Sequence, residues 1–537
     1  MPSRVNATND QSGAFASWRC EELGAIIKDI RDIGDNFEAD QHLAALVSNV
    51  GAVRAVTEAV QGTLGPKGLD CLLIDEHGGL VVTNDGVTIL KTMDVTHPAA
   101  RMLIDAAAHQ DELVGDGTTT ATVITGALIS EAANQILRGV PVMRVIDGIK
   151  AGIAHALDLL GQAALPTADV ASPALAEIAR IAARNHPDIA ALIIRAAREL
   201  GEKKLLEPGF CLADQVLALE GSESRMIRGT IVDRLPLNEN MPRVAGPCRI
   251  LILDDALEPL TLDGEALGTE TGVERWLQYE QELQSGLAKI AALQIKAIFT
   301  DRAISDLAEE RLTDYGIIGV QRVARAEWLR LAAMSGARPL KRNGLLKPAE
   351  ELVRSAGEAA AIEVDPVFRQ MVIFAPPRQQ FVTILAGAHT REVVREKERI
   401  ARDAAAAVQA AVRGGRVCGG GSVEISLARK LQGYRPAGLS GYGFDCVVLA
   451  LQQPLHQICA NAGLNPIEKV AEVMRRQEAE DSDSLGVNCE TGAVEDFVME
   501  GVWDPYLVKL HAIKTAGEVA EAILRIGNII KMKQHES

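Results

Sequence analysis

The segment Val114–Thr120 reads Val-Gly-Asp-Gly-Thr-Thr-Thr, and it restricts the fold more than any other part of this 537-residue chain. Two glycines allow the backbone to approach an anionic ligand, Asp116 offers a carboxylate for a divalent cation, and three threonines follow in a row. Residues 121–129 are apolar at roughly helical spacing, so we expect the loop to open a helix, whose unpaired N–H groups suit a phosphate. The pattern predicts a metal–nucleotide phosphate site; the alternative is a helix cap without a ligand.

Two further segments carry similar chemistry but are weak indications when taken singly. Gly62–Gly68 follows a stretch whose valines recur at helical spacing, and it ends in Gly-Pro-Lys-Gly rather than in the Gly-Lys-Ser/Thr of a P-loop. Glycine and proline also commonly end a helix. Val81–Thr88 is typical of a strand or hairpin tip that carries Asn84 and Asp85, although Asn-Asp-Gly is also an ordinary turn.

Together, and in this order, the motifs resemble the equatorial ATP site of the chaperonins. Residues 93–100 are similar to the group II branch, which includes the thermosome, and the resemblance extends from about Phe37 to Ile530. Because its two groups of motifs lie far apart in the chain, the resemblance implies a discontinuous domain with a long insertion. The matching segments are Thr63–Gly68, Asn84–Thr88, Gly115–Thr120, Gly419–Gly421, Gly486–Asn488 and Gly501–Pro505.

The implied fold class is a multidomain α and α/β subunit, with a helical equatorial domain, a small intermediate domain and an α/β apical domain that carries a helical lid protrusion. Short apolar runs alternate with helical stretches in the insertion, which is typical of buried strands. Gly148 and Gly387 fall near the expected hinges, although either could simply end a helix or strand. The expected bounds are an N-terminal extension 1–36, equatorial parts 37–148 and 407–530, intermediate parts 149–217 and 371–406, an apical domain 218–370 and a tail 531–537.

Residues 257–290 discriminate between chaperonin groups. They contain an amphipathic helix with Trp276, Leu277 and Leu283, at the place where group II apical domains carry a protrusion that serves as a built-in lid. The alternative is a surface loop and helix without a gating role. A built-in lid implies that no separate co-chaperonin is needed.

The resemblance also implies a role for each site residue. Asp116 would bind Mg²⁺, Asp85 would lie at the γ-phosphate, and Asp403 would position the attacking water. Without the resemblance, Asp403 would be interpreted as a solvated helix residue. The remaining assignments are Asn84, Gly117, Thr118, Thr119 and Thr120 on the phosphates, Thr63, Leu64, Gly65 and Pro66 on the opposite wall, Gly420 against the sugar, Asn488 near the base, and Asp504 on a ribose hydroxyl.

The implied function is ATP-dependent protein folding. Non-native polypeptide would be encapsulated in the cavity of a homo-oligomeric double ring, of eight-membered rings by the group II resemblance, and Mg²⁺-dependent ATP hydrolysis would be coupled to closure. A catalytically degenerate scaffold is the alternative, but Asp116 and Asp403 are both present. Residues 178–185 lack the Thr-Gly-Lys stretch of many group II members, so a nucleotide-sensing lysine stays open. Such departures favour the bacterial group III members over an archaeal thermosome.

Composition excludes several other classes. A net charge of −17 argues against a nucleic-acid partner, since such proteins usually carry a basic face. The eight cysteines are scattered without a Cys-x-x-Cys pair, which favours reduced thiols in a cytoplasm over a zinc site or disulfides. We see no run that approaches the roughly 20 apolar residues of a membrane span, so no membrane partner is expected.

Overall fold

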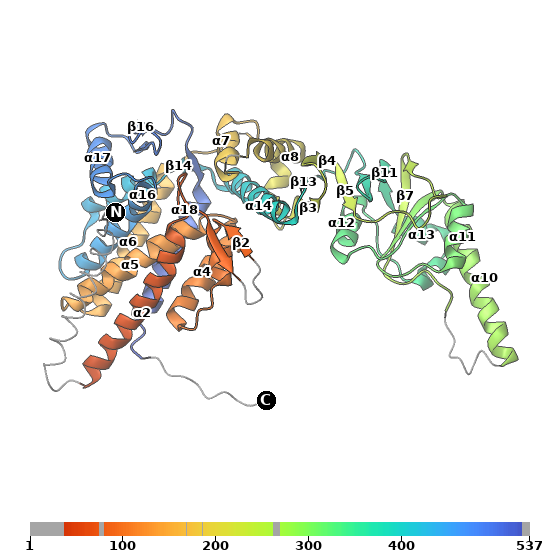
Figure 1. Cartoon of the computed structure of the whole chain (residues 1–537), viewed down its shortest axis with the longest axis horizontal. Coiled ribbons are helices and arrows are strands. Elements are labelled where there is room, and N and C mark those ends of the chain that lie inside the picture. The colour runs from red at the N-terminus through yellow and green to blue at the C-terminus, as the bar shows by residue number, and fades with distance from the viewer. Residues whose placement is uncertain (1–36, 75–79, 168, 185, 261–268, 529–537) are drawn as a thin grey trace, which may run out of the picture.

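The computed structural model describes residues 37–74, 80–167, 169–184, 186–260 and 269–528. The predicted N-terminal extension 1–36 and tail 531–537 lie outside these residues, as does part of the predicted lid, 261–268. The chain forms three parts in a row along its long axis (Figure 1). Helices from both ends of the chain form the equatorial part on the left, and the middle of the chain forms the apical part on the right.

The equatorial part is built around α5 (Thr118–Leu137), an apolar helix that is buried along most of its length. It packs against α2 (Phe37–Gln61) from the N-terminal half and against α16 (Ser440–Asn461) and α18 (Tyr506–Leu524) from the C-terminal half. A helix that is apolar on all sides is stable only at the centre of such a bundle. The predicted discontinuous domain is therefore present, since its core draws on both ends of the chain.

Further helices and several short strand pairs complete the equatorial part. A hairpin of β1 and β2 leads into α3, and the strand pairs β14–β17 and β15–β16 join the C-terminal helices. The bounds are β1 (Cys71–Ile74), β2 (Leu80–Thr83), α3 (Gly86–Thr92), α4 (Pro98–Val114), α6 (Val142–Ala163), β14 (Arg416–Cys418), α15 (Ser422–Leu431), α17 (Pro466–Ala479), β15 (Leu485–Val487), β16 (Val494–Asp496) and β17 (Trp503–Pro505).

Gly148 is not a hinge, contrary to the expectation from the sequence. It lies inside α6, where an added Cβ would come within 2.0 Å of the Ser440 carbonyl oxygen on α16. Glycine is required because the two helices cross there in close contact. Beyond it, Ile149 and Leu160 belong to the same equatorial core, so the equatorial packing continues to the end of α6 rather than stopping at residue 148.

The intermediate part combines three helices with a small sheet. Its helices are α7 (Pro173–Ala182), α8 (Pro187–Leu205) and the long α14 (Arg391–Gly414), and its sheet has the order β3 (Val216–Glu220), β13 (Thr383–Ala388), β4 (Arg225–Ile227). Proline opens both α7 and α8, at the first turn where its missing N–H has no cost. Gly387 lies inside β13, where an added Cβ would meet the Ser222 carbonyl oxygen at 2.2 Å, so it too is a close-packing position.

The apical part contains two four-stranded sheets. One has the order β10 (Gly357–Ala359), β7 (Cys248–Leu253), β8 (Ile295–Thr300), β9 (Ile318–Val320); the last three strands run parallel and are largely buried, and their burial agrees with the apolar runs in the sequence. The other has the order β5 (Gly229–Val232), β12 (Gln370–Phe374), β11 (Ala361–Asp365), β6 (Val244–Ala245). The α-helices of the apical part are α10 (Glu270–Ala292), α11 (Asp306–Asp314), α12 (Arg325–Ser335) and α13 (Ala349–Ser355).

The two crossings between the intermediate and apical parts fall at slightly different residues from those expected. The chain leaves the intermediate sheet after β4 and enters the apical sheet at β5, past the expected boundary at residue 217. It returns after β12, which pairs with β5 and β11 in the apical sheet, past the expected boundary at residue 370. A small cluster that includes Ile227, Ile231 and Leu385 packs at this junction.

Helix α10 is the described portion of the predicted lid. Thr269 caps its start, where the hydroxyl accepts a hydrogen bond from the Gly272 N–H at 3.1 Å. The C-terminal half buries Leu283 and Leu287 against the sheet, whereas the N-terminal half leaves Val273 and Leu277 exposed. The helix consequently projects from the apical end of the molecule (Figure 1).

Among the described residues, one helical segment has the length and composition of a possible membrane span. Leu43–Gln61, within α2, is long and apolar enough to span a membrane by length and composition, with a mean hydropathy of 1.3. The buried helix of a soluble bundle passes the same test, and Leu46, Val53 and Val60 of this stretch lie in the equatorial core. Packing therefore accounts for the apolar face of α2.

Candidate nucleotide site

The Val114–Thr120 loop connects α4 to α5 and is enclosed by two other helices. Gly115 and Gly117 have φ values of 66° and 80°, a left-handed conformation that favours glycine. An added Cβ would lie 2.3 Å from Cβ of Ala406 on α14 at the first glycine, and 2.5 Å from Cγ1 of Val508 on α18 at the second. Gly117 is the N-cap of α5, and within the described residues no side chain caps this helix start. Its first N–H groups remain available to an anion.

Asp116 is held at the centre of this loop. Its Oδ1 accepts a hydrogen bond from the Gly117 N–H at 2.6 Å, and Gln110 Nε2 donates to its carbonyl oxygen at 3.1 Å and to that of Val508 at 3.2 Å. Burial raises the pKa of the Asp116 carboxyl and outweighs the Gly117 hydrogen bond, while Asp504 raises the pKa further. A nearby cation would favour the charged form of this carboxyl.

The residues present fit a magnesium ion bound together with a phosphate ligand. Among the described residues no group of three or more His, Cys, Asp or Glu has the arrangement of an all-protein metal site. Mg²⁺ usually takes only one or two carboxylates and completes its shell with water and substrate phosphates. Asp116, at the uncapped start of α5, provides that kind of carboxylate.

Asp85 lies at the start of α3, and α3 begins beside α5. The Asp85 Oδ2 caps α3, accepting hydrogen bonds from the Thr88 N–H at 3.0 Å and from its hydroxyl at 2.6 Å. An added Cβ on Gly86 would lie 2.4 Å from Thr119 Oγ1 and 3.1 Å from Thr118 Oγ1. The structure thus brings Asp85 next to the threonines that follow Asp116.

Asp403 reaches the same place from the intermediate part. Asp403 lies on α14, whose alanines pack both in the intermediate core and against the equatorial Val114 and Val508. The Asp403 side chain is 20% exposed. Burial raises the pKa of Asp403 to about 8. The guanidinium groups of Arg399 and Arg184 lower this pKa, and the carboxylates of Asp85 and Asp116 raise it further. Three predicted carboxylates from three elements therefore act on one another.

The predicted sugar contacts also come together, at the pairing of β14 with β17. This pairing sets Gly419–Gly421 beside Asp504, and an added Cβ on Gly419 would lie 3.0 Å from the Asp504 carboxylate. Lys509 Nζ lies 2.9 Å from Asp504 Oδ2 and 2.7 Å from Glu424 Oε1. The two carboxylates raise the pKa of Lys509 against the effect of burial, so the lysine is charged.

Two loops lie on the other side of the predicted nucleotide site: residues 63–68, and the turn between β15 and β16. Asn461 on α16 holds the first loop by donating to the carbonyl oxygen of Leu64 at 2.8 Å, and the turn at Gly65 has a φ of 87°. Asn488 closes the β15–β16 turn: its Nδ2 donates to Glu495 Oε2 at 2.8 Å, and its Oδ1 accepts from the Glu490 N–H at 2.9 Å. The loops meet where Lys67 and Glu490 form an ion pair of 2.6 Å.

Helix α16 connects the first loop to the glycine turn. An added Cβ on Gly65 would lie 3.0 Å from Ile458 Cγ1, and one on Gly421 would lie 2.9 Å from Leu455 Cβ. Both contacts are made by one face of α16, one helical turn apart. The segments of the first and second groups of motifs are therefore neighbours across this helix.

Sequence reasoning missed several charged residues of the site. Arg184, with a φ of 45° just after α7, lowers the pKa of both Asp116 and Asp403, so an arginine supplies positive charge from the segment that lacks the Thr-Gly-Lys stretch. Arg399 contacts Asp403 and Asn84. Because Arg399 lies one helical turn before Asp403, the sequence could have indicated that these two side chains lie close together. Glu424 and Lys509, 85 residues apart, gave none.

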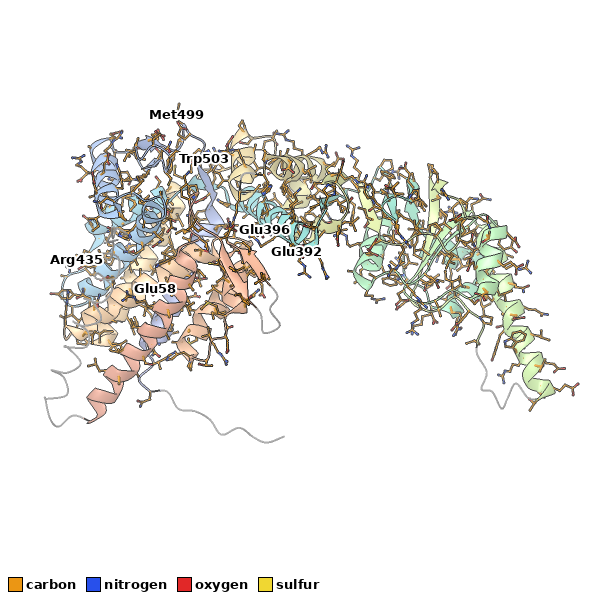
Figure 2. All side chains as sticks on the ribbon, in the orientation of Figure 1. Glu58, Glu392, Glu396, Arg435, Met499 and Trp503 are labelled. Atoms are coloured by element: carbon orange, nitrogen blue, oxygen red, sulfur yellow. The ribbon has the colours of Figure 1, made fainter. Side chains whose placement is uncertain are left out.

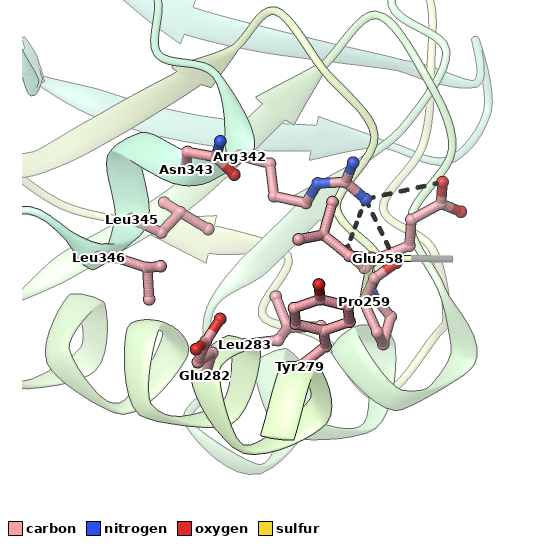
Figure 3. Close-up of a pocket in the computed structure, with 10 residues that line it drawn as sticks. Glu258, Pro259, Tyr279, Glu282, Leu283, Arg342, Asn343, Leu345 and Leu346 are labelled. Carbon is pink, nitrogen blue, oxygen red and sulfur yellow. Dashed lines mark hydrogen bonds and ion pairs between the residues drawn. The ribbon is translucent and has the colours of Figure 1, made fainter. Parts of the chain in front are cut away.

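A cavity in the apical part is separate from this site. It lies between α10, residues 258–260 and the turn at 342–346, and it measures about 30 Å³ (Figure 3). Arg342 Nη1 closes one side by donating to the carbonyl oxygens of Glu258 and Pro259 at 3.1 and 3.2 Å. Such a volume holds about one water molecule, so it offers no room for a nucleotide.

Comparison with known proteins agrees with this architecture. Residues 56–534 match the TCP-1/cpn60 chaperonin family. The chain is 33% identical over 504 residues to thermosome subunit beta of Archaeoglobus fulgidus, covering 90% of this chain and 91% of that protein. It is 34% identical over 502 residues to the thermosome subunit of Methanocaldococcus jannaschii, with coverage of 90% and 91%.

A solved structure extends the likeness to three dimensions. The crystal structure of a group III chaperonin in the open state superposes with a TM-score of 0.85 at 41% sequence identity, and the match covers 92% of this chain and all of that one. The chain belongs to the TCP-1/cpn60 chaperonin family. It has the chaperonin fold, and its relatives support an ATP-dependent chaperonin function.

Proposed function

We propose that this chaperonin subunit hydrolyses ATP with Mg²⁺ at the site between α3, α5 and α14, and that hydrolysis drives the folding of encapsulated polypeptide. One observation carries the proposal. Asp85, Asp116 and Asp403 come from three elements and two parts of the molecule, yet they converge on the uncapped start of α5. Three carboxylates around an anion-binding helix terminus suit the binding of a metal–phosphate complex.

The equatorial residues would bind and orient the nucleotide. The N–H groups at the start of α5 and the hydroxyls of Thr118, Thr119 and Thr120 face the phosphates, and Asp116 holds Mg²⁺. When bound, the metal neutralises phosphate charge. The remaining contacts are those of Asn84 and Gly117 with phosphate, of Thr63, Leu64, Gly65 and Pro66 with the opposite side, of Gly420 and Asp504 with the ribose, and of Asn488 near the base.

Asp403 would act on the attacking water. A carboxyl whose pKa is raised toward neutrality is a better proton acceptor than an ordinary aspartate, and efficient general bases have pKa values near the working pH. Asp85, fixed at the N-cap of α3, would lie by the γ-phosphate and help to align the water. Both side chains are oriented by the elements that carry them before any nucleotide arrives.

Helix α14 would connect hydrolysis to closure of the chamber. It carries Asp403 and packs in the intermediate core, so a movement of the intermediate part would move Asp403 relative to the phosphates. The projecting α10 would contribute the built-in lid, so that no co-chaperonin is needed. The assembly would be a homo-oligomer of two stacked eight-membered rings that acts on non-native polypeptide in the cytoplasm, and the seven cysteines within the described residues are free thiols.

The test compares the wild type with Asp403→Ala. We expect Mg²⁺-dependent ATP hydrolysis to fall by about 10²–10⁴-fold, the usual contribution of general acid–base catalysis, while light scattering still shows a large particle that binds ATP. Glu398→Ala, on the same helix and paired with Arg402 at 3.4 Å, is the matched control and should hydrolyse ATP normally.

Two outcomes would contradict the proposal. A large wild-type particle without turnover would indicate the degenerate scaffold. A small wild-type particle that hydrolyses ATP would exclude the folding chamber.

A further inference from the structure

The guanidinium of Arg399 lies at the contact between the intermediate and equatorial parts. It is carried by α14, one turn before Asp403, and its side chain is 16% exposed. Its Nη1 lies 2.9 Å from Asp403 Oδ2, and its Nη2 donates to Asn84 Oδ1 at 3.1 Å. Asn84 belongs to the loop between β2 and α3. The Arg399 side chain thus contacts both Asp403 and Asn84, and Asn84 lies in the same loop as Asp85.

Glu396 fixes the orientation of this guanidinium. Arg399 Nε donates to Glu396 Oε2 at 3.1 Å and Nη2 donates to Glu396 Oε1 at 2.5 Å, a two-point contact within α14. Glu396 projects from α14 in the middle of the molecule (Figure 2). Residues 396, 399 and 403 share one face of the helix because they are three and four positions apart. With one edge of the planar fork bound to Glu396, the other N–H groups point toward Asp403 and Asn84.

The charge of Arg399 is also placed between carboxylates of both parts. Its Nη1 lies 3.9 Å from Asp85 Oδ1, in addition to the direct contact with Asp403. When both carboxylates are charged, Asp85 and Asp403 would repel each other without a cation between them and oppose the approach of α14 to α3. A planar guanidinium suits this place better than a lysine ammonium, since it can contact several oxygens in fixed directions.

We propose that Arg399 is a positioning residue for ATP hydrolysis, which holds the Asp403 carboxylate against the loop of Asn84 and Asp85. The inference rests on the proposed function of Asp403. Arg399 acts through Asp403, so its removal should displace the carboxylate without removing a contact to the nucleotide. A displacement of about 1 Å in a catalytic group can reduce turnover about 10²-fold.

The experiment measures kcat and KM for ATP hydrolysis by the full-length assembly. For Arg399→Gln we expect kcat to fall by about 10–100-fold with KM changed less than about threefold, because only the orientation of Asp403 is lost. Arg399→Lys keeps the charge but not the fork and should recover part of kcat. Arg402→Gln is the matched control: this neighbouring arginine is 47% exposed, pairs with Glu398 and should hydrolyse ATP like the wild type.

A double variant shows whether the effect passes through Asp403. Arg399→Gln combined with Asp403→Ala should be no slower than Asp403→Ala alone, since residues that act as one unit are not additive. Wild-type kcat in Arg399→Gln, or additive losses in the double variant, would overturn the inference and leave the role of Asp403 intact. Normal turnover in Asp403→Ala would overturn the proposed function itself, and the inference with it. Light scattering on each variant confirms that the particle is assembled.

Discussion

The two ends of the nucleotide site are held by ion pairs of different kinds. At the sugar end, Lys509 is 8% exposed and Glu424 is fully buried, and both lie within the equatorial part together with Asp504. At the phosphate end, Arg399 pairs with Asp403 on its own helix α14 and reaches the equatorial part through a longer contact of 3.9 Å with Asp85. We infer from this contrast that the phosphate end separates more readily than the sugar end. A buried group of charges is costly to separate, whereas a single longer ion pair between two parts is weaker and costs less to break.

The sugar end gives the largest expected effect. Lys509→Met would leave Glu424 buried without its cation, and breaking a buried pair by removing one partner destabilises a protein by about 3–5 kcal/mol. Thermal unfolding of the purified protein should show a strongly lowered apparent Tm. Lys514→Met, on the same helix α18, removes a lysine that is 57% exposed and lies 3.9 Å from Glu518, so its Tm should stay close to that of the wild type.

A double variant of Lys509 and Glu424 separates the effect of charge on stability from the effect of packing. Replacing Glu424 as well, in Lys509→Met with Glu424→Leu, should recover part of the lost stability, because it removes the fully buried unpaired charge and leaves only the partly exposed Asp504 without its lysine. A Tm for Lys509→Met equal to that of Lys514→Met would show that the buried pair at the sugar end contributes no more stability than an exposed pair on the same helix.

The rigidity of the equatorial part can be tested through its closest helix crossing. Gly148→Ala should destabilise the protein by about 1–3 kcal/mol, the usual range for overpacking, because the new Cβ would lie 2.0 Å from the Ser440 carbonyl oxygen. The measurement is the apparent Tm at a fixed scan rate. Gly51→Ala in α2 is the control: apart from the backbone of its own helix, no described atom lies within 4 Å of its added Cβ, so it should stabilise by about 0.5–1 kcal/mol. Equal Tm values would mean that α6 and α16 can separate.

Local motifs could be interpreted from the sequence because their chemistry lies in consecutive residues. Gly115 and Gly117 flank Asp116, and the left-handed turns and the helix start that follow are local consequences of that order. The buried strands of the apical sheet were likewise indicated by short apolar runs, although their parallel pairing was not predicted. The family resemblance then related segments that no periodicity could relate, such as Asp403 and Asp85.

What could not be predicted depends on contacts between distant segments. Gly148 has the same sequence signature whether it serves as a hinge or a close crossing, and only the position of Ser440 decides between them. The partnership of Lys509 with Glu424 is decided by the packing of α18 against β14 and β17. Arg399 lies in a helix rich in charged residues, where most such side chains are solvated, so its contact with Asn84 could not be distinguished in advance.

The role of Asp403 at the phosphate end can be tested through the pH dependence of ATP hydrolysis. Burial raises the pKa of Asp403 to about 8, so the carboxyl is mostly neutral below that pH and charged above it. If the carboxylate accepts a proton from water, kcat/KM, which reflects groups of the nucleotide-free enzyme, should rise by about tenfold per pH unit on the acid side and level off above roughly pH 8. An ordinary aspartate would place that rise near its usual pKa of about 3.9, far below the pH range in which proteins are commonly assayed.

Arg399→Gln sharpens this prediction, because the guanidinium lowers the pKa of Asp403. Its removal should move the rise in kcat/KM to higher pH, whereas Lys509 lies at the other end and its replacement should leave the pH of the rise unchanged. The profile is measured at ATP concentrations far below KM and at constant Mg²⁺, so that the rate reports kcat/KM. A kcat/KM that stays constant from roughly pH 6 to 9, or a rise that Arg399→Gln does not displace, would mean that the charge of Asp403 is not what limits the reaction. The partly exposed contact would then be a structural link between two parts of the molecule, and the distinction between the two ends would concern stability alone.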